Sequence, residues 1–218
     1  YSFLMSLVKK ESVEEVLKNN SIFDFELLKD ALKEFNEKKN LISIENVLDK
    51  QYYSSLIQFS KSLPREGALF RDFLRKEVEI LNILTLLRLK KAKFDKDIVK
   101  NFVILSGDKK EDSKIMSLAA LEDLEALSKA LEKTRYKDLI QKGIEEFNKS
   151  GSLIALEIEL YKYLLKESVL LLHQNPLSID AILGYMFAKD IEVRNLRIIV
   201  KGKQLGLSDE FIESQLIF

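Results

Sequence analysis

Two glutamates, Glu79 and Glu192, are the residues of this sequence whose type and setting could do chemistry. Each lies in an apolar stretch that has the residue spacing of an α-helix. Burial among apolar side chains raises the pKa of a carboxyl group, which can then act as a general acid or base. One hypothesis is therefore a helical-bundle enzyme in which both carboxylates reach one solvent-accessible pocket.

An asparagine follows each glutamate at the same spacing. Asn82 follows Glu79 and Asn195 follows Glu192 at the third position, so each pair shares one face of a helix. The two pairs lie 113 residues apart (192 − 79). Buried polar groups need hydrogen-bond partners, because burying them unpaired costs several kcal/mol. A second hypothesis is therefore a polar clasp that fixes how helices dock, and it explains better than catalysis why the pair occurs twice.

Arginines accompany the second pair only. Arg194 and Arg197 are candidate partners of Glu192, whereas leucines occupy the equivalent positions near Glu79. The carboxylate of Glu79 must therefore find its partner elsewhere in the chain. The predicted clasp comprises Glu79, Asn82, Glu192, Arg194, Asn195 and Arg197.

No other motif indicates catalysis, a metal or a cofactor. The stretch 201–206 departs from the Walker pattern, because Arg197 occupies its first glycine position and Gln204 its last, so a basic helix end is the better interpretation. His173, the single histidine, is interpreted as a turn residue rather than a metal ligand. The chain has no cysteine, which excludes disulfides and thiolate metal sites. We expect no cofactor and no metal.

The composition narrows the possible partners. Lys and Arg together number 35, as do Asp and Glu, and this balance argues against nucleic acid as the main partner. No apolar run approaches the roughly 20 residues that span a bilayer, so no membrane span is predicted. Two prolines and seven glycines in 218 residues are few, which favours long helices over a β-rich fold.

The apolar spacing predicts an all-α chain. Asp95 and Ser208 are expected to cap helices, and Gly206 suits the left-handed position that ends one. The stretch 106–113 is the most linker-like, and Pro64 and Pro176 mark turns. The predicted helices cover 1–18, 24–39, 44–63, 68–93, 95–104, 118–133, 136–148, 153–173, 181–203 and 208–216.

The repeat extends beyond the glutamate–asparagine pairs. Glu34-Phe35-Asn36 recurs 112 residues later (146 − 34) as Glu146-Phe147-Asn148, and Pro64 recurs as Pro176 at the same offset. The offset becomes 113 after that turn, where one inserted residue is tolerated. We therefore predict tandem helical units over residues 1–107 and 108–218.

At residues 192–199, followed by 201–203 and 206–207, the chain resembles the C subunit of archaeal and bacterial A/V-type ATPases, the counterpart of the d subunit of eukaryotic V-ATPases. The resemblance implies a funnel-like, all-helical fold of three similar units around a pseudo-threefold axis. Because only two units are visible here, we expect the N-terminal third unit to be missing, which agrees with the start at Tyr1. The stretches that carry the resemblance are 192–199, 201–203, 206–207, 176–179, 188–189, 44–49 and 52–53.

The resemblance also implies a non-catalytic rotor part. Such a protein lies on the cytoplasmic end of the membrane proteolipid ring and receives the central stalk of subunits D and F. It transmits torque between ATP chemistry and proton or sodium transport. We expect partner contacts at the helix ends and turns, at 64–67, 92–95, 174–179 and 202–208, with Lys201 and Lys203 as contact residues. The alternative is a generic helical-repeat scaffold unrelated to rotary ATPases, which predicts a concave binding face.

Overall fold

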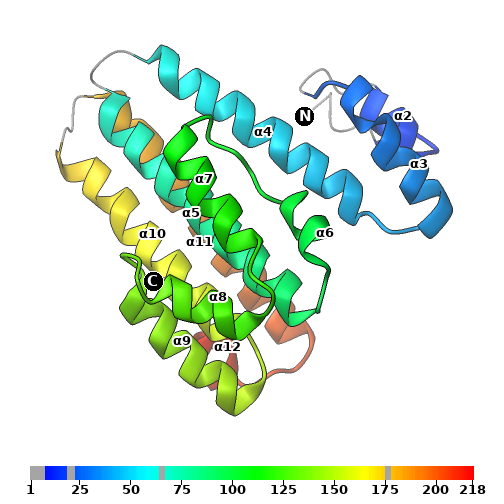
Figure 1. Cartoon of the computed structure of the whole chain (residues 1–218). Coiled ribbons are helices and arrows are strands. Elements are labelled where there is room, and N and C mark those ends of the chain that lie inside the picture. The colour runs from blue at the N-terminus through cyan, green and yellow to red at the C-terminus, as the bar shows by residue number, and fades with distance from the viewer. Residues whose placement is uncertain (1–7, 19–22, 64–66, 175–177) are drawn as a thin grey trace. The chain divides into compact units, whose positions relative to one another are not determined.

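A computed structural model describes residues 8–18, 23–63, 67–174 and 178–218 (Figure 1). Within these ranges every regular element is a helix and no strand occurs, which confirms the all-α prediction. The predicted turns at Pro64 and Pro176 lie outside the described residues, as do residues 1–7 of the first predicted helix. The elements are α2 (Val13–Lys18), η1 (Glu26–Leu28), α3 (Lys29–Lys38), α4 (Ile42–Ser62), α5 (Ala68–Lys91), α6 (Lys96–Lys100), α7 (Lys109–Ala119), α8 (Leu124–Leu131), α9 (Lys137–Ser150), α10 (Ile154–Gln174), α11 (Ile179–Gln204) and α12 (Asp209–Ser214).

Packing divides the chain into two compact units, Tyr1–Gln58 and Phe59–Phe218. The first unit has a small core in which the apolar stripe of α3 is buried together with apolar residues from α2, η1 and the start of α4. The predicted units 1–107 and 108–218 follow the sequence repeat instead, and they stay a prediction. The buried residues of this small core are Leu17, Leu28, Ala31, Leu32 and Ile44.

In the second unit, α5 and α10 are buried along much of their length, and α10 packs along α11, α9 and α5 (Figure 1). The ion pair Lys76–Glu167 (2.6 Å) joins α5 to α10 near one end, and Arg88–Glu157 (2.6 Å) joins the same helices near the other. Asp180 at the start of α11 is fully buried, and its Oδ1 accepts the Phe70 amide of α5 at 3.0 Å. The three long helices are therefore tied together by charged and polar contacts as well as by apolar packing.

Two sequence predictions about the middle of the chain were wrong. Residues 106–113 are not a linker, because Asp108 accepts the amides of Lys110 and Glu111 and so caps α7. The single helix predicted over 118–133 is divided into the end of α7 and the separate helix α8, which Asp123 caps through the amide of Ala126. Polar residues that resembled a linker in the sequence are helix caps in the structure.

Local features recur at the predicted offsets. Helices α4 and α10 each contain 21 residues, and their first residues lie 112 apart (154 − 42). Lys93 and Gly206 both adopt left-handed φ, 58° and 67°, after α5 and α11. Asp95 and Ser208 cap α6 and α12 through their side chains. The left-handed Gly206 and both caps are confirmed, and the recurrences support our proposal of a repeated helical unit.

Candidate functional site

Asn82 and Asn195 each clamp a backbone segment to a long helix. The Asn82 amide nitrogen donates to the Ile104 carbonyl at 2.8 Å, and its Oδ1 accepts the Ile104 amide at 2.8 Å. Asn195 makes the same two bonds with Ile217, at 2.6 and 3.0 Å. In both places the clamped residue follows the short helix after the long one, so each asparagine fixes how α6 or α12 returns to α5 or α11.

Glu79 is bound by three donors from two different segments. The Tyr136 hydroxyl donates to its Oε2 at 3.0 Å, Lys114 of α7 pairs with its Oε1 at 3.4 Å, and Arg135 pairs with its Oε2. Burial, together with the negative charge of Glu79, raises the pKa of the Tyr136 hydroxyl, which therefore stays a donor. Glu79 thus connects α5 to α7 and to the residues that precede α9.

The sequence did not point to Arg135 or Tyr136 as partners of Glu79. They lie 56 and 57 residues further along the chain, so no local spacing connects them to the glutamate. The one signal in the sequence was an Arg-Tyr pair just before a helix. This signal is weak, because such a pair is not specific to any one kind of contact. Long-range partners of this kind become visible only once the helices are packed.

A cavity of about 280 Å³ lies beside Glu79 between α5, α7 and α8. Its apolar wall includes Val78, Ile83, Ile115 and Leu131, and cationic side chains line it as well. Glu192 does not line this cavity, so the two glutamates do not form the shared pocket that the enzyme hypothesis requires. The charged residues that line it are Arg75, Glu79, Lys110, Glu111, Asp112, Lys114 and Arg135.

Glu192 lies in a different environment from the one expected. Its side chain is 57% exposed, and in the described part of the chain its ion pair is with Lys189 of the same helix at 2.6 Å. Neither predicted arginine pairs with it. The Arg194 guanidinium lies 4.0 Å from the centre of the Tyr161 ring on α10, and Arg197 is exposed. The clasp proposal therefore rests on the two asparagines, Glu79 and Arg194 rather than on Glu192 and Arg197.

Lys201 and Lys203 lie in the last turn of α11, and both are exposed. Lys203 pairs with Asp209 in the first turn of α12. Lys201 lines an apolar cavity of about 340 Å³ between α10, α11 and α12, together with Ile154, Tyr161 and Phe211. Of the two predicted contact residues, Lys201 is thus the one that lines a cavity, and Glu157 and Arg194 line the same cavity.

Lys90, the counterpart of Lys203, was not singled out in the sequence. It is 4% exposed, and its Nζ has no hydrogen-bond partner in the described part of the chain. In the second copy, Lys203 forms an ion pair with Asp209. The position equivalent to Asp209 in the first copy is Lys96, so Lys90 has no carboxylate there to pair with. Burial lowers the pKa of Lys90, and the more distant carboxylates of Asp95 and Asp123 offset part of that effect.

The comparisons with known proteins agree on one family. A family model described as "ATP synthase (C/AC39) subunit" matches residues 1–215. The C subunit of the A-type ATP synthase of Methanocaldococcus jannaschii is 30% identical over 215 residues, which are 98% of this chain and 54% of that protein. The corresponding C subunits of Methanococcoides burtonii and Methanosarcina acetivorans are each 37% identical over 221 residues, which cover this whole chain and 59% and 58% of those proteins. The chain thus spans little more than half the length of these relatives. No solved structure matches it significantly.

Proposed function

We propose that this chain, which belongs to the family of ATP synthase (C/AC39) subunits, is a non-catalytic adaptor in the rotor of an A/V-type rotary ATPase. Its partners would be the membrane proteolipid ring and the central-stalk subunits D and F, on the cytoplasmic face of the membrane. There it would pass torque between ATP chemistry and proton or sodium transport. The observation that carries the proposal is the family match over residues 1–215.

The close helix packing of the second unit supports a role in transmitting torque. Close-packed interiors transmit strain, and α5 and α10 are joined near both ends by the ion pairs Lys76–Glu167 and Arg88–Glu157. Gly184 of α11 lies so close to α10 that a Cβ would be 2.7 Å from the Ser168 carbonyl oxygen. Helices held this tightly resist sliding past one another, as torsional load on an adaptor requires.

Two further observations fit an adaptor at a membrane. No helix among the described residues is both long enough and apolar enough to cross a bilayer. The exposed Lys201 beside an apolar hollow is suited to a contact with another polypeptide. The funnel-like, pseudo-symmetric arrangement implied by the resemblance remains part of the proposal, and the family match favours it over a scaffold unrelated to rotary ATPases.

A pull-down with two purified partners tests the proposal. The chain is immobilised and offered detergent-solubilised proteolipid ring and, separately, the D/F stalk. We expect both to bind, and we expect the charge reversals Lys201→Glu and Lys203→Glu together to weaken at least one of them. Lys142→Glu on α9, also an exposed lysine, is the matched control. Binding to neither partner by a chain that is helical by circular dichroism would overturn the adaptor role.

A further inference from the structure

The cavity beside Glu79 has an apolar wall whose residues are buried. The cavity lies where α7 and α8 cover α5, as Figure 1 shows, and its volume is about 280 Å³. That is roughly twice the volume of an engineered cavity that binds benzene, so an apolar body of about eight to ten carbon atoms fits it. The apolar wall residues, none more than 9% exposed, are Val78, Ile83, Ile104, Ile115, Leu118 and Leu131.

The carboxylates that line this cavity are already bound to donors of the chain. Both oxygens of Asp112 accept backbone amides, that of Ser106 at 2.7 Å and that of Gly107 at 3.0 Å. Glu111 accepts the Ser106 hydroxyl at 3.3 Å, and Glu79 is held by its three donors. A cationic ligand would have to displace these donors, so the acidic residues do not make the cavity a cation site.

Two cations at the same cavity have no such partner. Arg75 of α5 and Lys110 of α7 both line it and are exposed, and neither forms an ion pair within the described ranges of the chain. Both lie near enough to Asp108 to lower the pKa of its carboxyl group, so their charges are close to each other. The position equivalent to Arg75 on α11 is Ala188, so the repeated helix itself does not require a cation there. The two cations are therefore available to an anionic group from outside the chain.

We propose that this cavity binds a small organic anion, a carboxylate with an apolar chain of about eight carbon atoms. The chain lies against Ile83, Ile115 and Leu131, and the carboxylate group meets Arg75 and Lys110 at the exposed mouth. Small-molecule sites combine an apolar wall with a few charged groups in this way, and the charged groups fix the orientation of the ligand. The inference is independent of the adaptor role, because it rests on the cavity alone.

The unpaired cations select an anion over two other kinds of ligand. A neutral apolar molecule would fill the same wall but would leave Arg75 and Lys110 without a counter-charge. A cationic molecule would meet like charges, because four cations and three carboxylates line the cavity, a net charge of +1 (4 − 3). A carboxylate with an apolar chain satisfies the wall and the two cations together.

Occupancy of the cavity has a consequence for the second unit. A ligand held there contacts α5, α7 and α8 at once, beside the bonds of Glu79 that join the same part of the chain. Because it binds the folded chain and not the unfolded one, it stabilises this packing increasingly as its concentration rises. We therefore expect the midpoint of thermal unfolding to rise with the concentration of the ligand.

Octanoate is the probe, and isothermal titration calorimetry of the intact chain measures its affinity. Octanol and octyltrimethylammonium carry the same apolar chain without the negative charge, and acetate carries the charge without the chain. We expect octanoate to bind about fivefold or more tightly than octanol, because two exposed ion pairs contribute modestly. It should bind at least about tenfold more tightly than acetate, because its longer chain is removed from water.

NMR of 13C-labelled isoleucine methyl groups locates the ligand. Octanoate should shift the signal of Ile115, which lines the cavity. The signals of Ile44, in the core of the first unit, and of Ile212, at the cavity that Lys201 lines, should stay in place. This pattern distinguishes the proposed site from the other apolar regions of the chain.

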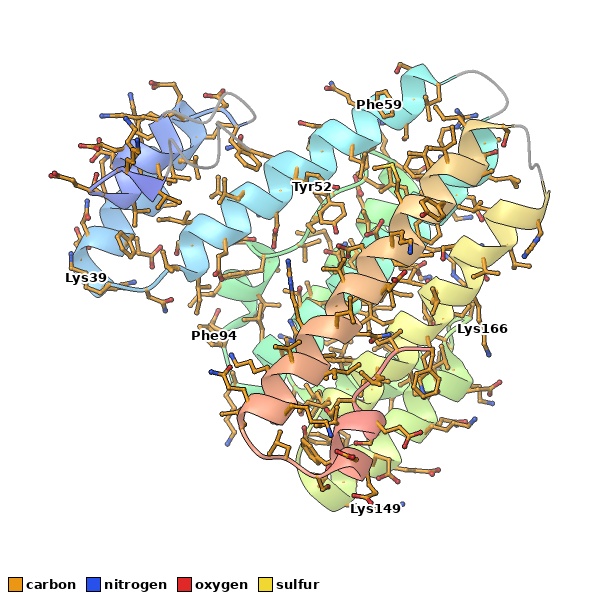
Figure 2. The ribbon with its side chains drawn as sticks, turned by 180° about the vertical axis from the view of Figure 1, so that it is seen from behind. Lys39, Tyr52, Phe59, Phe94, Lys149 and Lys166 are labelled. Carbon is orange, nitrogen blue, oxygen red and sulfur yellow. The ribbon has the colours of Figure 1, made fainter. Side chains whose placement is uncertain are left out.

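A charge variant and a matched control test the role of the two cations. Arg75→Gln with Lys110→Gln should weaken octanoate binding about fivefold or more and leave octanol binding unchanged. Both residues are exposed, so the variant should fold as the wild type does, which circular dichroism checks. Arg197→Gln with Lys166→Gln changes an exposed arginine and an exposed lysine that do not line the cavity, and it should bind octanoate as the wild type does. Lys166 lies on α10 and is labelled in Figure 2.

Any of four results would overturn the proposal. They are no binding of octanoate at millimolar concentration, equal affinities for octanoate, octanol and octyltrimethylammonium, wild-type octanoate affinity in the variant with Arg75→Gln and Lys110→Gln, and methyl shifts at Ile44 or Ile212 in place of Ile115. The assay contains neither ring nor stalk, so its failure would leave the proposed adaptor role untouched. Failure of the pull-down would likewise leave the octanoate measurements unaffected.

Discussion

The C-terminal halves of α5 and α11 use the same asparagine clamp in different surroundings. Asn82 is 3% exposed, and Glu79 one turn earlier is bound by Tyr136, Arg135 and Lys114. Asn195 is only half-buried, and Glu192 is exposed. The local hydrogen bonds are alike because the helix spacing is alike. What differs is coverage by later helices, which makes the first site part of a core and leaves the second near a surface.

Removal of the clamps should show this difference most strongly. Asn82→Ala leaves the Ile104 amide and carbonyl buried and unsatisfied, so we expect a loss of about 2–3 kcal/mol in the free energy of unfolding. Asn195→Ala should cost about 1 kcal/mol, because Asn195 itself is only half-buried and water can take the place of its side chain more easily. Urea unfolding followed by circular dichroism measures both. Equal losses would mean that burial does not separate the two clamps.

The two glutamates provide the next test. Glu79→Gln removes the charge that Arg135 and Lys114 face, and we expect a loss of about 1 kcal/mol in the free energy of unfolding. Glu192→Gln should leave it within measurement error, since its ion pair with Lys189 is largely exposed. The same urea titrations apply. A larger loss in Glu192→Gln than in Glu79→Gln would contradict the structural role of Glu79.

The third test compares Lys90 with its counterpart Lys203, and here replacement of the buried residue is expected to stabilise the chain rather than destabilise it. Lys90→Met replaces a buried, unpaired ammonium by an apolar group of similar length, so it should stabilise the chain by about 1 kcal/mol near neutral pH. Lys203→Met only breaks the exposed pair with Asp209 and should change little. Thermal unfolding at one pH compares the two variants. Destabilisation by Lys90→Met would show that its ammonium has a partner in solution.

The pH dependence of Lys90→Met follows from the lowered pKa of Lys90. Its folded value lies below its ordinary 10.5, so between the two values the unfolded chain binds more protons and wild-type stability rises with pH. The advantage of Lys90→Met should therefore shrink as the pH rises through that window and vanish above 10.5. Other lysines cancel when the variant is compared with the wild type at each pH.

The sequence predicted what depends on neighbours along the chain and missed what depends on coverage. The spans of the long helices α5, α10 and α11, the caps Asp95 and Ser208 and the left-handed Gly206 follow from local spacing and were predicted. The exposure of Glu192 was not, because apolar neighbours show which face a residue shares but not whether a later helix covers that face. Asp108 was misjudged because the same Ser-Gly-Asp composition suits a linker and an N-cap.

The smallest contrast concerns the residues that end the two long helices. Lys93 and Gly206 share a left-handed φ, which costs a residue with a Cβ more than it costs glycine. Lys93→Gly should therefore stabilise the chain by about 0.5 kcal/mol, and Gly206→Ala should destabilise it by about 1 kcal/mol. No atom within 4 Å would meet a Cβ at Gly206, so backbone strain alone sets that cost. Thermal unfolding resolves both shifts, and a stabilising Gly206→Ala would mean that the end of α11 adopts another backbone conformation in solution.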